Sequence, residues 1–271
     1  MTDDPTRKDR TIDLTVDIDA TLDEVWQALT TGEGIARWFA PLAAVTPGEG
    51  GSVSVGWDPN EMWTQPITAW EPGRRMQTAS EMPTDGGRVV RLAVDYYLEA
   101  LDGGRVRVRL VHSGFDDSAS WDGYIDGLDA GWTYFLFNLK HAIERHRGIA
   151  RRQLSARFRT SAPPGQVHPV YGATGLQVTP AVDGLRAGDA CRLTLGGVEV
   201  EAAVAVRRPD RTTAFLVPAW NDGLLFVERE GMKDTHTLGV WLSLYGVPDA
   251  VAAPLQAGLA DLASRLRAPD A

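Results

Sequence analysis

The spacing of the apolar residues changes between residues 112 and 121, and this change limits the folds open to the chain. Between residues 90 and 112 apolar side chains recur at alternate positions, which is typical of two strands that each bury one face. From Trp121 to Ile143 they recur at spacings of three and four, which predicts a long helix. A one-faced sheet and a one-faced helix bury their apolar surfaces by packing together.

The segment before these strands predicts one strand and two short helices. Residues 12–18 alternate between apolar and polar, as in a half-buried strand. Thr21 and Glu24 have the spacing of a capping box, so we expect a helix to begin there. A second short helix is predicted around residues 35–39, because their aromatic and aliphatic side chains share a helical face, and Pro41 limits it.

Two further strands are predicted before residue 90. Residues 52–57 alternate, and residues 62–71 form a probable strand that contains Pro66, which favours an edge position or a bulge. The order is therefore strand, two short helices, an antiparallel run of strands and one long helix. This order predicts an α+β fold in which a curved antiparallel sheet wraps a long C-terminal helix.

This pattern resembles the START/SRPBCC helix-grip superfamily, whose members are similar to the birch pollen allergen. The resemblance is carried by EVWQALTTGEGIARWF (24–39), LVHSGF (110–115) and the helical stripe from Trp121 to Ile143, and it covers residues 11–147. The branch that looks most similar is that of the activator of Hsp ATPase homologues. Because the superfamily includes lipid carriers, polyketide aromatases, resistance proteins and co-chaperone modules, the resemblance implies a fold rather than one function.

The second half of the chain resembles the first. GDACRLTLGG (188–197) is similar to GGSVSVGW (50–57), and a last apolar stripe at helical spacing runs from residue 251 to residue 266. We therefore predict two tandem helix-grip domains, residues 1–150 and a degenerate copy at 151–271. One elaborated domain is the alternative. Regular helices are not expected in residues 161–175, which are rich in proline and glycine.

Composition excludes several classes of protein. The 271 residues carry a net charge of −9, which argues against nucleic acid and anionic membrane surfaces as partners. No apolar run is long enough to span a bilayer, and the N-terminus lacks the apolar core of a signal peptide. Cys191 is the one cysteine, so we expect no intrachain disulfide and a cytoplasmic location. The oligomeric state is left open.

Two polar residues are expected on the inner side of the sheet. His112 shares the parity of the apolar residues of its strand, and Tyr96 shares that of the preceding strand. An inward histidine could contact a ligand or act as a general base, or it could be a core residue bonded to a backbone carbonyl. Tyr96 could orient a ligand or be a packed core tyrosine.

No metal site or cofactor is predicted. His141 and His146 are five residues apart and do not share a helical face. Asp122, Asp126 and Asp129 are interpreted as a solvated helix face.

Aromatic residues are concentrated in the first half, which holds 15 of the 22 Phe, Trp and Tyr residues. Flat indole rings suit flat polycyclic ligands, and pockets are mostly apolar with a few placed polar groups. We therefore predict a cavity between the first sheet and its helix. Its predicted ligand-binding residues are Trp26, Trp38, Phe39, Trp57, Tyr96, His112, Gly114, Phe115, Trp121 and Trp132.

The predicted function is the binding of a hydrophobic, polycyclic small molecule. The resemblance implies a place in polyketide or enediyne biosynthesis or in self-resistance, since one similar protein protects its host by sacrificing its backbone at a glycine; Gly114 is the candidate here. A polyketide cyclase or aromatase, with His112 and Tyr96 as its acid/base pair, is one alternative. A co-chaperone-like interaction module is the other.

Overall fold

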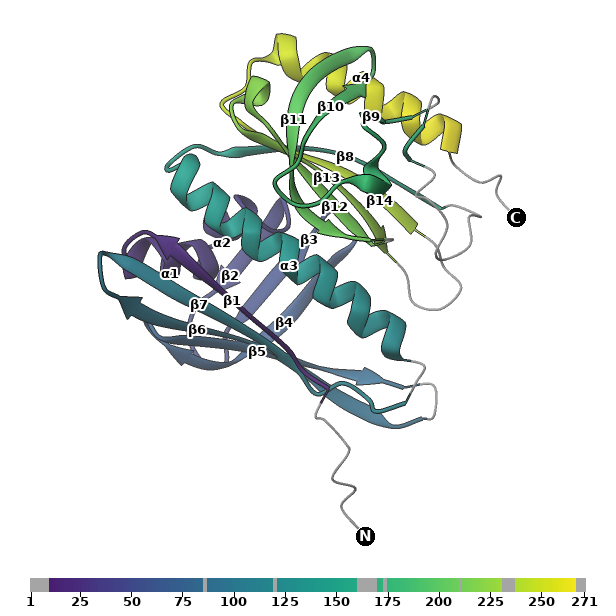
Figure 1. Cartoon of the computed structure of the whole chain (residues 1–271). Coiled ribbons are helices and arrows are strands. Elements are labelled where there is room, and N and C mark those ends of the chain that lie inside the picture. Colours follow the sequence, from purple (N-terminus) through teal and green to yellow (C-terminus); the bar gives the residue numbers. More distant parts are fainter. Residues whose placement is uncertain are drawn as a thin grey trace. The chain divides into compact units, whose positions relative to one another are not determined.

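The computed structural model describes residues 10–84, 87–118, 121–159, 170–172, 175–209, 211–230 and 237–266 (Figure 1). The chain divides into two compact units. The first comprises Met1–Ile125 with Asn138–Glu144, and the second comprises Asp126–Phe137 with Arg145–Ala271.

The first unit contains a seven-stranded antiparallel sheet. Its strands are β1 (Ile12–Asp19), β2 (Leu42–Thr46), β3 (Ser52–Gly56), β4 (Met62–Glu71), β5 (Arg75–Pro83), β6 (Val89–Leu101) and β7 (Arg105–Ser113). They lie in the order β1-β7-β6-β5-β4-β3-β2, so the first strand pairs with the last. Helices α1 (Leu22–Thr30) and α2 (Gly32–Ala36) connect β1 to β2.

The second unit contains a sheet with the same connectivity. Its strands are β8 (Arg151–Arg159), β9 (Gln177–Thr179), β10 (Ala190–Leu195), β11 (Val198–Arg208), β12 (Thr212–Val217), β13 (Gly223–Glu230) and β14 (Thr237–Tyr245). Their order is β8-β14-β13-β12-β11-β10-β9. Two 3₁₀ turns, η2 (Val182–Gly184) and η3 (Pro218–Trp220), and helix α4 (Asp249–Leu266) complete it.

The two matching sheets confirm the predicted α+β fold with tandem helix-grip copies (Figure 1). The division into residues 1–150 and 151–271 stays a proposal. Most of the proline- and glycine-rich segment 161–175 lies outside the described residues, so the expectation that it lacks regular helices is not tested.

The local signals in the first unit act largely as the sequence predicts, but the second short helix spans Gly32–Ala36 and not residues 35–39. The Thr21 hydroxyl accepts a hydrogen bond from the Glu24 amide at 3.3 Å, and the Glu24 carboxylate accepts one from the Thr21 amide at 2.8 Å. This capping box satisfies two amides that a helix start leaves without partners. In β4, Pro66 lies in an interior strand and not at an edge, and the register shifts between Ile67 and Ala69. The bulge interpretation therefore holds.

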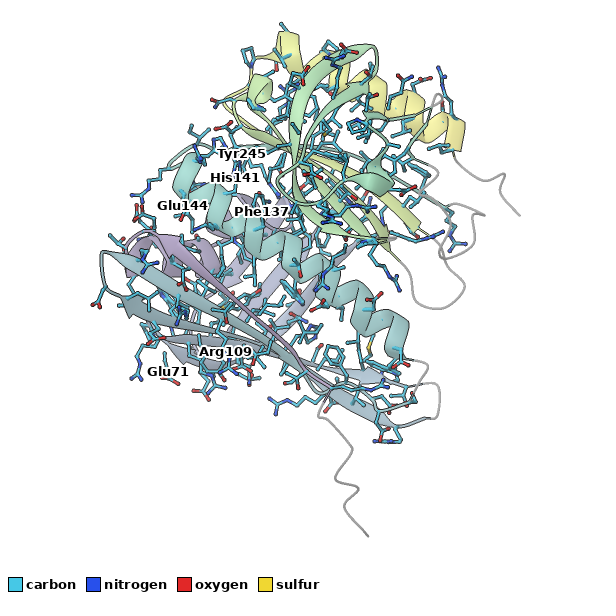
Figure 2. All side chains as sticks on the ribbon, in the orientation of Figure 1. Glu71, Arg109, Phe137, His141, Glu144 and Tyr245 are labelled. Atoms are coloured by element: carbon cyan, nitrogen blue, oxygen red, sulfur yellow. The ribbon has the colours of Figure 1, made fainter. Side chains whose placement is uncertain are left out.

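The first sheet has a buried inner face and a charged outer face. On β7, Val106, Val108 and Leu110 are almost fully buried on the inner face. On the outer face, Arg107 forms an ion pair with Asp17 at 2.8 Å. Arg109 forms one with Asp13 at 2.6 Å, and Figure 2 marks Arg109 on this sheet. The arginines on the outer face of β7 thus form ion pairs with aspartates of β1 and are also in contact with solvent.

The long helix predicted from residue 121 is α3 (Asp122–Arg145), and its residues belong to both units. Residues 122–125 and 138–144 belong to the first unit, and the segment between them belongs to the second. In that segment the Tyr134 ring stacks on Phe226 of β13, with ring centroids 3.5 Å apart. No described helix is long and apolar enough to cross a membrane.

The acidic residues of α3 are ion-paired as well as solvated. Asp122 contacts Arg10 at 2.6 Å in the first unit. In the second unit Asp126 contacts Arg211 at 2.6 Å, and Asp129 contacts Arg208. Asp122 and Asp126 are more than half exposed, as expected for a solvated face, but sequence analysis missed these arginine partners.

Helix α4 packs closely on the β10–β11 turn through two glycines. A Cβ atom on Gly258 would lie 2.7 Å from the Cα atom of Gly196, closer than packed atoms approach. Gly131 in α3 is a matched helical glycine with room, since the nearest atom to its Cβ position is 4.0 Å away, on Phe135.

These two glycines should respond in opposite ways to the same substitution. Gly258→Ala should destabilise the protein by about 1–3 kcal/mol, because the added methyl group forces α4 away from the turn. Gly131→Ala should stabilise it by about 0.5–1 kcal/mol, because alanine loses less backbone entropy in a helix. Denaturant unfolding of both variants measures the difference, and equal effects would contradict the close packing of α4.

Candidate functional site

The centre of the inner face of the first sheet carries Tyr96 and His112. In the register of β6 and β7, Tyr96 lies opposite Leu110 and His112 lies opposite Val94. The two polar residues are therefore diagonal neighbours on one face. Both are buried, with 7% and 6% of their surface exposed. The inward orientation predicted from sequence is confirmed.

Burial keeps both side chains neutral at pH 7. Desolvation raises the pKa of the Tyr96 hydroxyl far above its ordinary range. The same cause lowers the pKa of His112 from 6.5 to about 4. These side chains can therefore donate and accept hydrogen bonds on the inner face, but they bring no charge to it.

The turn after α2 places Trp38 beside Tyr96. The two rings meet edge to face with centroids 6.5 Å apart. The Trp38 indole donates a hydrogen bond to the Ala28 carbonyl at 3.0 Å. The backbone carbonyl of Trp38 accepts one from the side-chain amide of Asn138 at 2.6 Å. Trp38 is only 2% exposed, so it is a fixed part of the interior.

From Trp38 a run of aromatic rings continues to the surface. Trp38 contacts Phe39 at 5.4 Å, Phe39 contacts Trp57 at 5.2 Å, and Trp57 stacks on Trp63 at 5.2 Å between centroids. Trp63 is 43% exposed. Its partner across β3 and β4 is the buried Val55, so Trp63 lies on the inner face. Trp63 is not among the ligand-binding residues predicted from the sequence, although its parity in the 52–71 strand pair could have indicated its position on the inner face.

A second aromatic group lies next to His112. The centroid of the His112 ring lies 4.7 Å from that of the Phe115 ring. Phe115 lies 6.4 Å from both Trp121 and Tyr124, and those two rings meet edge to face at 5.4 Å. The structure thus brings together three of the predicted residues and adds Tyr124.

Two further polar residues extend the His112 row. Thr78 of β5 lies opposite Val94, which lies opposite His112, so the three share the inner face. Thr78 is 4% exposed, and its hydroxyl donates a hydrogen bond to the Gln65 side chain at 3.2 Å. Thr78 and Gln65 were not predicted from the sequence, because only the register of several strands places them beside His112.

Two predicted residues lie outside these groups. Trp26 of α1 packs edge to face on Trp70 at 5.0 Å, still within the first unit. Trp132 belongs to the α3 segment of the second unit, where it meets Phe135 at 6.2 Å. Trp132 is therefore not grouped with the other predicted residues, because the middle of α3 clusters with the second sheet.

Gly114 has a structural reason to be glycine. Its φ of +87° lies in the left-handed region that side chains disfavour. A Cβ atom there would lie 1.9 Å from the Arg91 carbonyl oxygen. The backbone at the end of β7 thus needs glycine at this position whether or not a ligand is bound.

The described histidines and acidic residues do not gather into a metal site. Among the residues that the structure describes, no group of three His, Cys, Asp or Glu side chains could hold a metal ion. Figure 2 shows His141 and Glu144 on the C-terminal half of α3. The Glu144 carboxylate accepts hydrogen bonds from the Asp19 amide and the Lys140 ammonium, each at 2.7 Å, so it ties α3 to the end of β1.

The first unit is thus a helix-grip domain with an aromatic inner face. Residues 19–144 match the family described as Activator of Hsp90 ATPase homolog 1-like protein. This match confirms the family resemblance for the first unit. It covers less than half of the 271 residues and ends before the second sheet begins at Arg151. No curated protein matches the chain.

Several solved structures are similar to the chain. Protein MLL2253 from Mesorhizobium loti is 20% identical, with 50% of this chain and 97% of that chain covered and a TM-score of 0.44. DynU16, from the dynemicin biosynthetic locus, is 19% identical over 96% of this chain and 98% of its own, with a TM-score of 0.42. CalU16 from Micromonospora echinospora is 24% identical, with 49% of this chain and 76% of that chain covered and a TM-score of 0.39.

The buried His112 should make stability depend on pH. Between pH 6.5 and about 4 the unfolded chain binds a proton at His112 that the folded chain does not, so stability falls as pH is lowered through this window. The loss should reach roughly 3 kcal/mol at pH 4. Between pH 7 and pH 5, the melting temperature of His112→Gln should therefore fall less than that of the unchanged protein. Parallel pH profiles would contradict the neutral, buried imidazole.

Proposed function

We propose that the inner face of the first unit binds a flat, apolar small molecule, of the size of a polycyclic aromatic. The observation that carries this proposal is the continuous run of rings from the exposed Trp63 to the buried Tyr96. Pockets for such ligands are mostly apolar with a few polar groups that set orientation. Tyr96 and His112 supply neutral polar groups at the inner end of this run.

The exposed end of the run supports entry of a ligand at Trp63. The Trp57 and Trp63 rings lie nearly parallel, with an interplanar angle of 27°. A flat ligand that continues this stack would cover indole surface that water now contacts. Each such ring pair contributes about 0.5–1.5 kcal/mol beyond the area it buries.

The electrostatics of the inner face favour binding over catalysis. A general acid or base works best when its pKa lies near the working pH. Burial moves the pKa of His112 down to about 4 and that of Tyr96 far up, so neither exchanges protons readily at pH 7. A cyclase or aromatase would need a ligand that moves both pKa values toward 7, so we favour binding over this alternative.

The biological setting follows from the sequence resemblance. A role in polyketide or enediyne biosynthesis or self-resistance, in the cytoplasm, is our proposal for this ligand. A sacrificial role for Gly114 would add to its backbone role, since its geometry already requires glycine.

The proposal can be tested by titrating the protein with a hydroxyanthraquinone and following tryptophan fluorescence. Trp63→Leu should weaken binding by about 0.5–1.5 kcal/mol, because the substitution keeps bulk but removes the stacking face. Tyr97→Leu is the matched control, because Tyr97 is similarly exposed, at 37%, and its position next to the inward Tyr96 places it on the outer face. Its affinity should be unchanged.

Two outcomes would contradict the proposal. One is unchanged affinity in Trp63→Leu, and the other is an equal loss in both variants, which would indicate binding outside the inner face. Tyr96→Phe refines the test, since it removes one hydroxyl and keeps the ring. We expect it to weaken binding of the hydroxyanthraquinone more than it weakens binding of anthracene, which has no hydrogen-bonding group.

The family description favours a second candidate, stimulation of a chaperone ATPase. This activity would depend on an exposed partner surface and not on the inner face. Adding the protein to Hsp90 and measuring ATP hydrolysis separates the two. Stimulation that persists in Trp63→Leu would support the co-chaperone function.

A further inference from the structure

A bulge in β11 turns one arginine toward the core of the second unit. The register between β11 and β12 shifts between Val204 and Val206, after which Arg207 lies opposite Thr213. Thr213 is two residues from Phe215, which packs in the core beside α4, so these side chains share a face. Arg207 is therefore directed to the α4 face. Arg208 is directed to the opposite face, where it contacts Asp129.

The Arg207 guanidinium is largely buried and only partly paired. Its side chain is 12% exposed. Nη1 donates a hydrogen bond to the Thr213 hydroxyl at 3.0 Å, which fixes the orientation of the plane. Nε has no hydrogen-bond partner among the described residues. The edge formed by Nε and Nη2 therefore carries a buried N–H group that has no hydrogen-bond partner among the described residues.

The carboxylate near this edge is a weak partner. Asp183 of η2 lies 3.6 Å from Nη2, beyond hydrogen-bond distance, and its side chain is 59% exposed. Because the Asp183 carboxylate remains mostly in solvent, it compensates the burial of Arg207 only in part. A buried guanidinium costs free energy unless its charge and its N–H groups are satisfied. The edge therefore favours an additional anion.

The surroundings of Arg207 combine polar groups with apolar walls. The buried Tyr171 hydroxyl lies in the electrostatic neighbourhood of Thr213 and Arg207, and Arg229 is a second buried cation at 5% exposure. Arg229 is two residues from Val227, the partner of Thr213, so it also lies on the α4 face. The neighbouring core contains the buried side chains of Val170, Leu176, Val182 and Leu185. A few convergent polar groups in an apolar setting are typical of a ligand site.

We propose that Arg207 binds the carboxylate of an organic acid in the second unit, through Nε and Nη2. The parallel N–H groups of this edge match the two oxygens of a carboxylate. Thr213 orients the guanidinium, Arg229 adds positive charge, and Asp183 competes with the ligand. This site lies wholly in the second unit and is independent of the aromatic face of the first.

Isothermal titration of the full chain with benzoate tests the proposal, with benzyl alcohol as the uncharged probe of similar shape. Benzoate should bind and benzyl alcohol should not. Arg207→Gln should weaken benzoate binding at least tenfold, and Arg207→Lys should weaken it several-fold, because an ammonium lacks the planar edge. Arg192→Gln is the matched control, since Arg192 is an exposed arginine of the same sheet that is paired with Glu201.

Asp183→Asn provides an independent test, because it keeps shape and removes the competing charge. It should tighten benzoate binding several-fold. Weaker binding together with a lower melting temperature would show that Asp183 is the counterion of Arg207, and it would overturn the proposal. Unchanged benzoate affinity in a folded Arg207→Gln variant would overturn it as well. Tighter binding of inorganic phosphate than of benzoate would reject the carboxylate as the ligand group.

Discussion

The pairing of the first strand with the last organises each of the two sheets. In the first unit β1 pairs with β7, which leaves β2 at the opposite edge. The chain must therefore cross the sheet between β1 and β2, and α1 and α2 make this connection. The crossing carries Trp38 to Tyr96 at the centre of the inner face. One strand pairing thus both fixes the order of the strands and places the aromatic residues of the candidate site.

The same constraint acts in the second unit. Because β8 pairs with β14, β9 lies at the far edge of its sheet. The described part of this connection brings Tyr171 to Thr213, next to Arg207. In each copy the segment that joins the first two strands therefore contributes a residue to the candidate site.

The two sites differ in the state of their buried polar groups. Burial favours neutral forms of Tyr96 and His112, which suits an uncharged aromatic ligand. The guanidinium group of arginine is a strong cation, so the surroundings of Arg207 favour an anionic ligand. The two proposed sites thus place different buried polar groups on one repeated architecture. This difference arises from single side chains and one bulge, since the order of the strands is the same.

Much of the candidate site could be read from strand parity. The inward positions of Tyr96 and His112 follow from alternation along a single strand, and so both were predicted. Thr78 and Gln65 were missed, because their place beside His112 depends on the register of several strands. Trp132 was assigned to the first sheet because its helical spacing matches that of Trp121. Spacing cannot tell which of two sheets a helical segment contacts.

The sequence by itself determined many elements of this protein, although β2 and β8 were not predicted. Alternation indicated β1, β3, β6 and β7, a capping box began α1, and helical spacing indicated α3 and α4, because these signals depend on residues close together in the chain. Only the tertiary structure decided which elements meet. The stacking of Tyr134 on Phe226, the run of rings to Trp63 and the turn of Arg207 toward the core depend on register and packing between distant segments. No local pattern encodes such contacts, since their free energy is gained only when the sheets have formed.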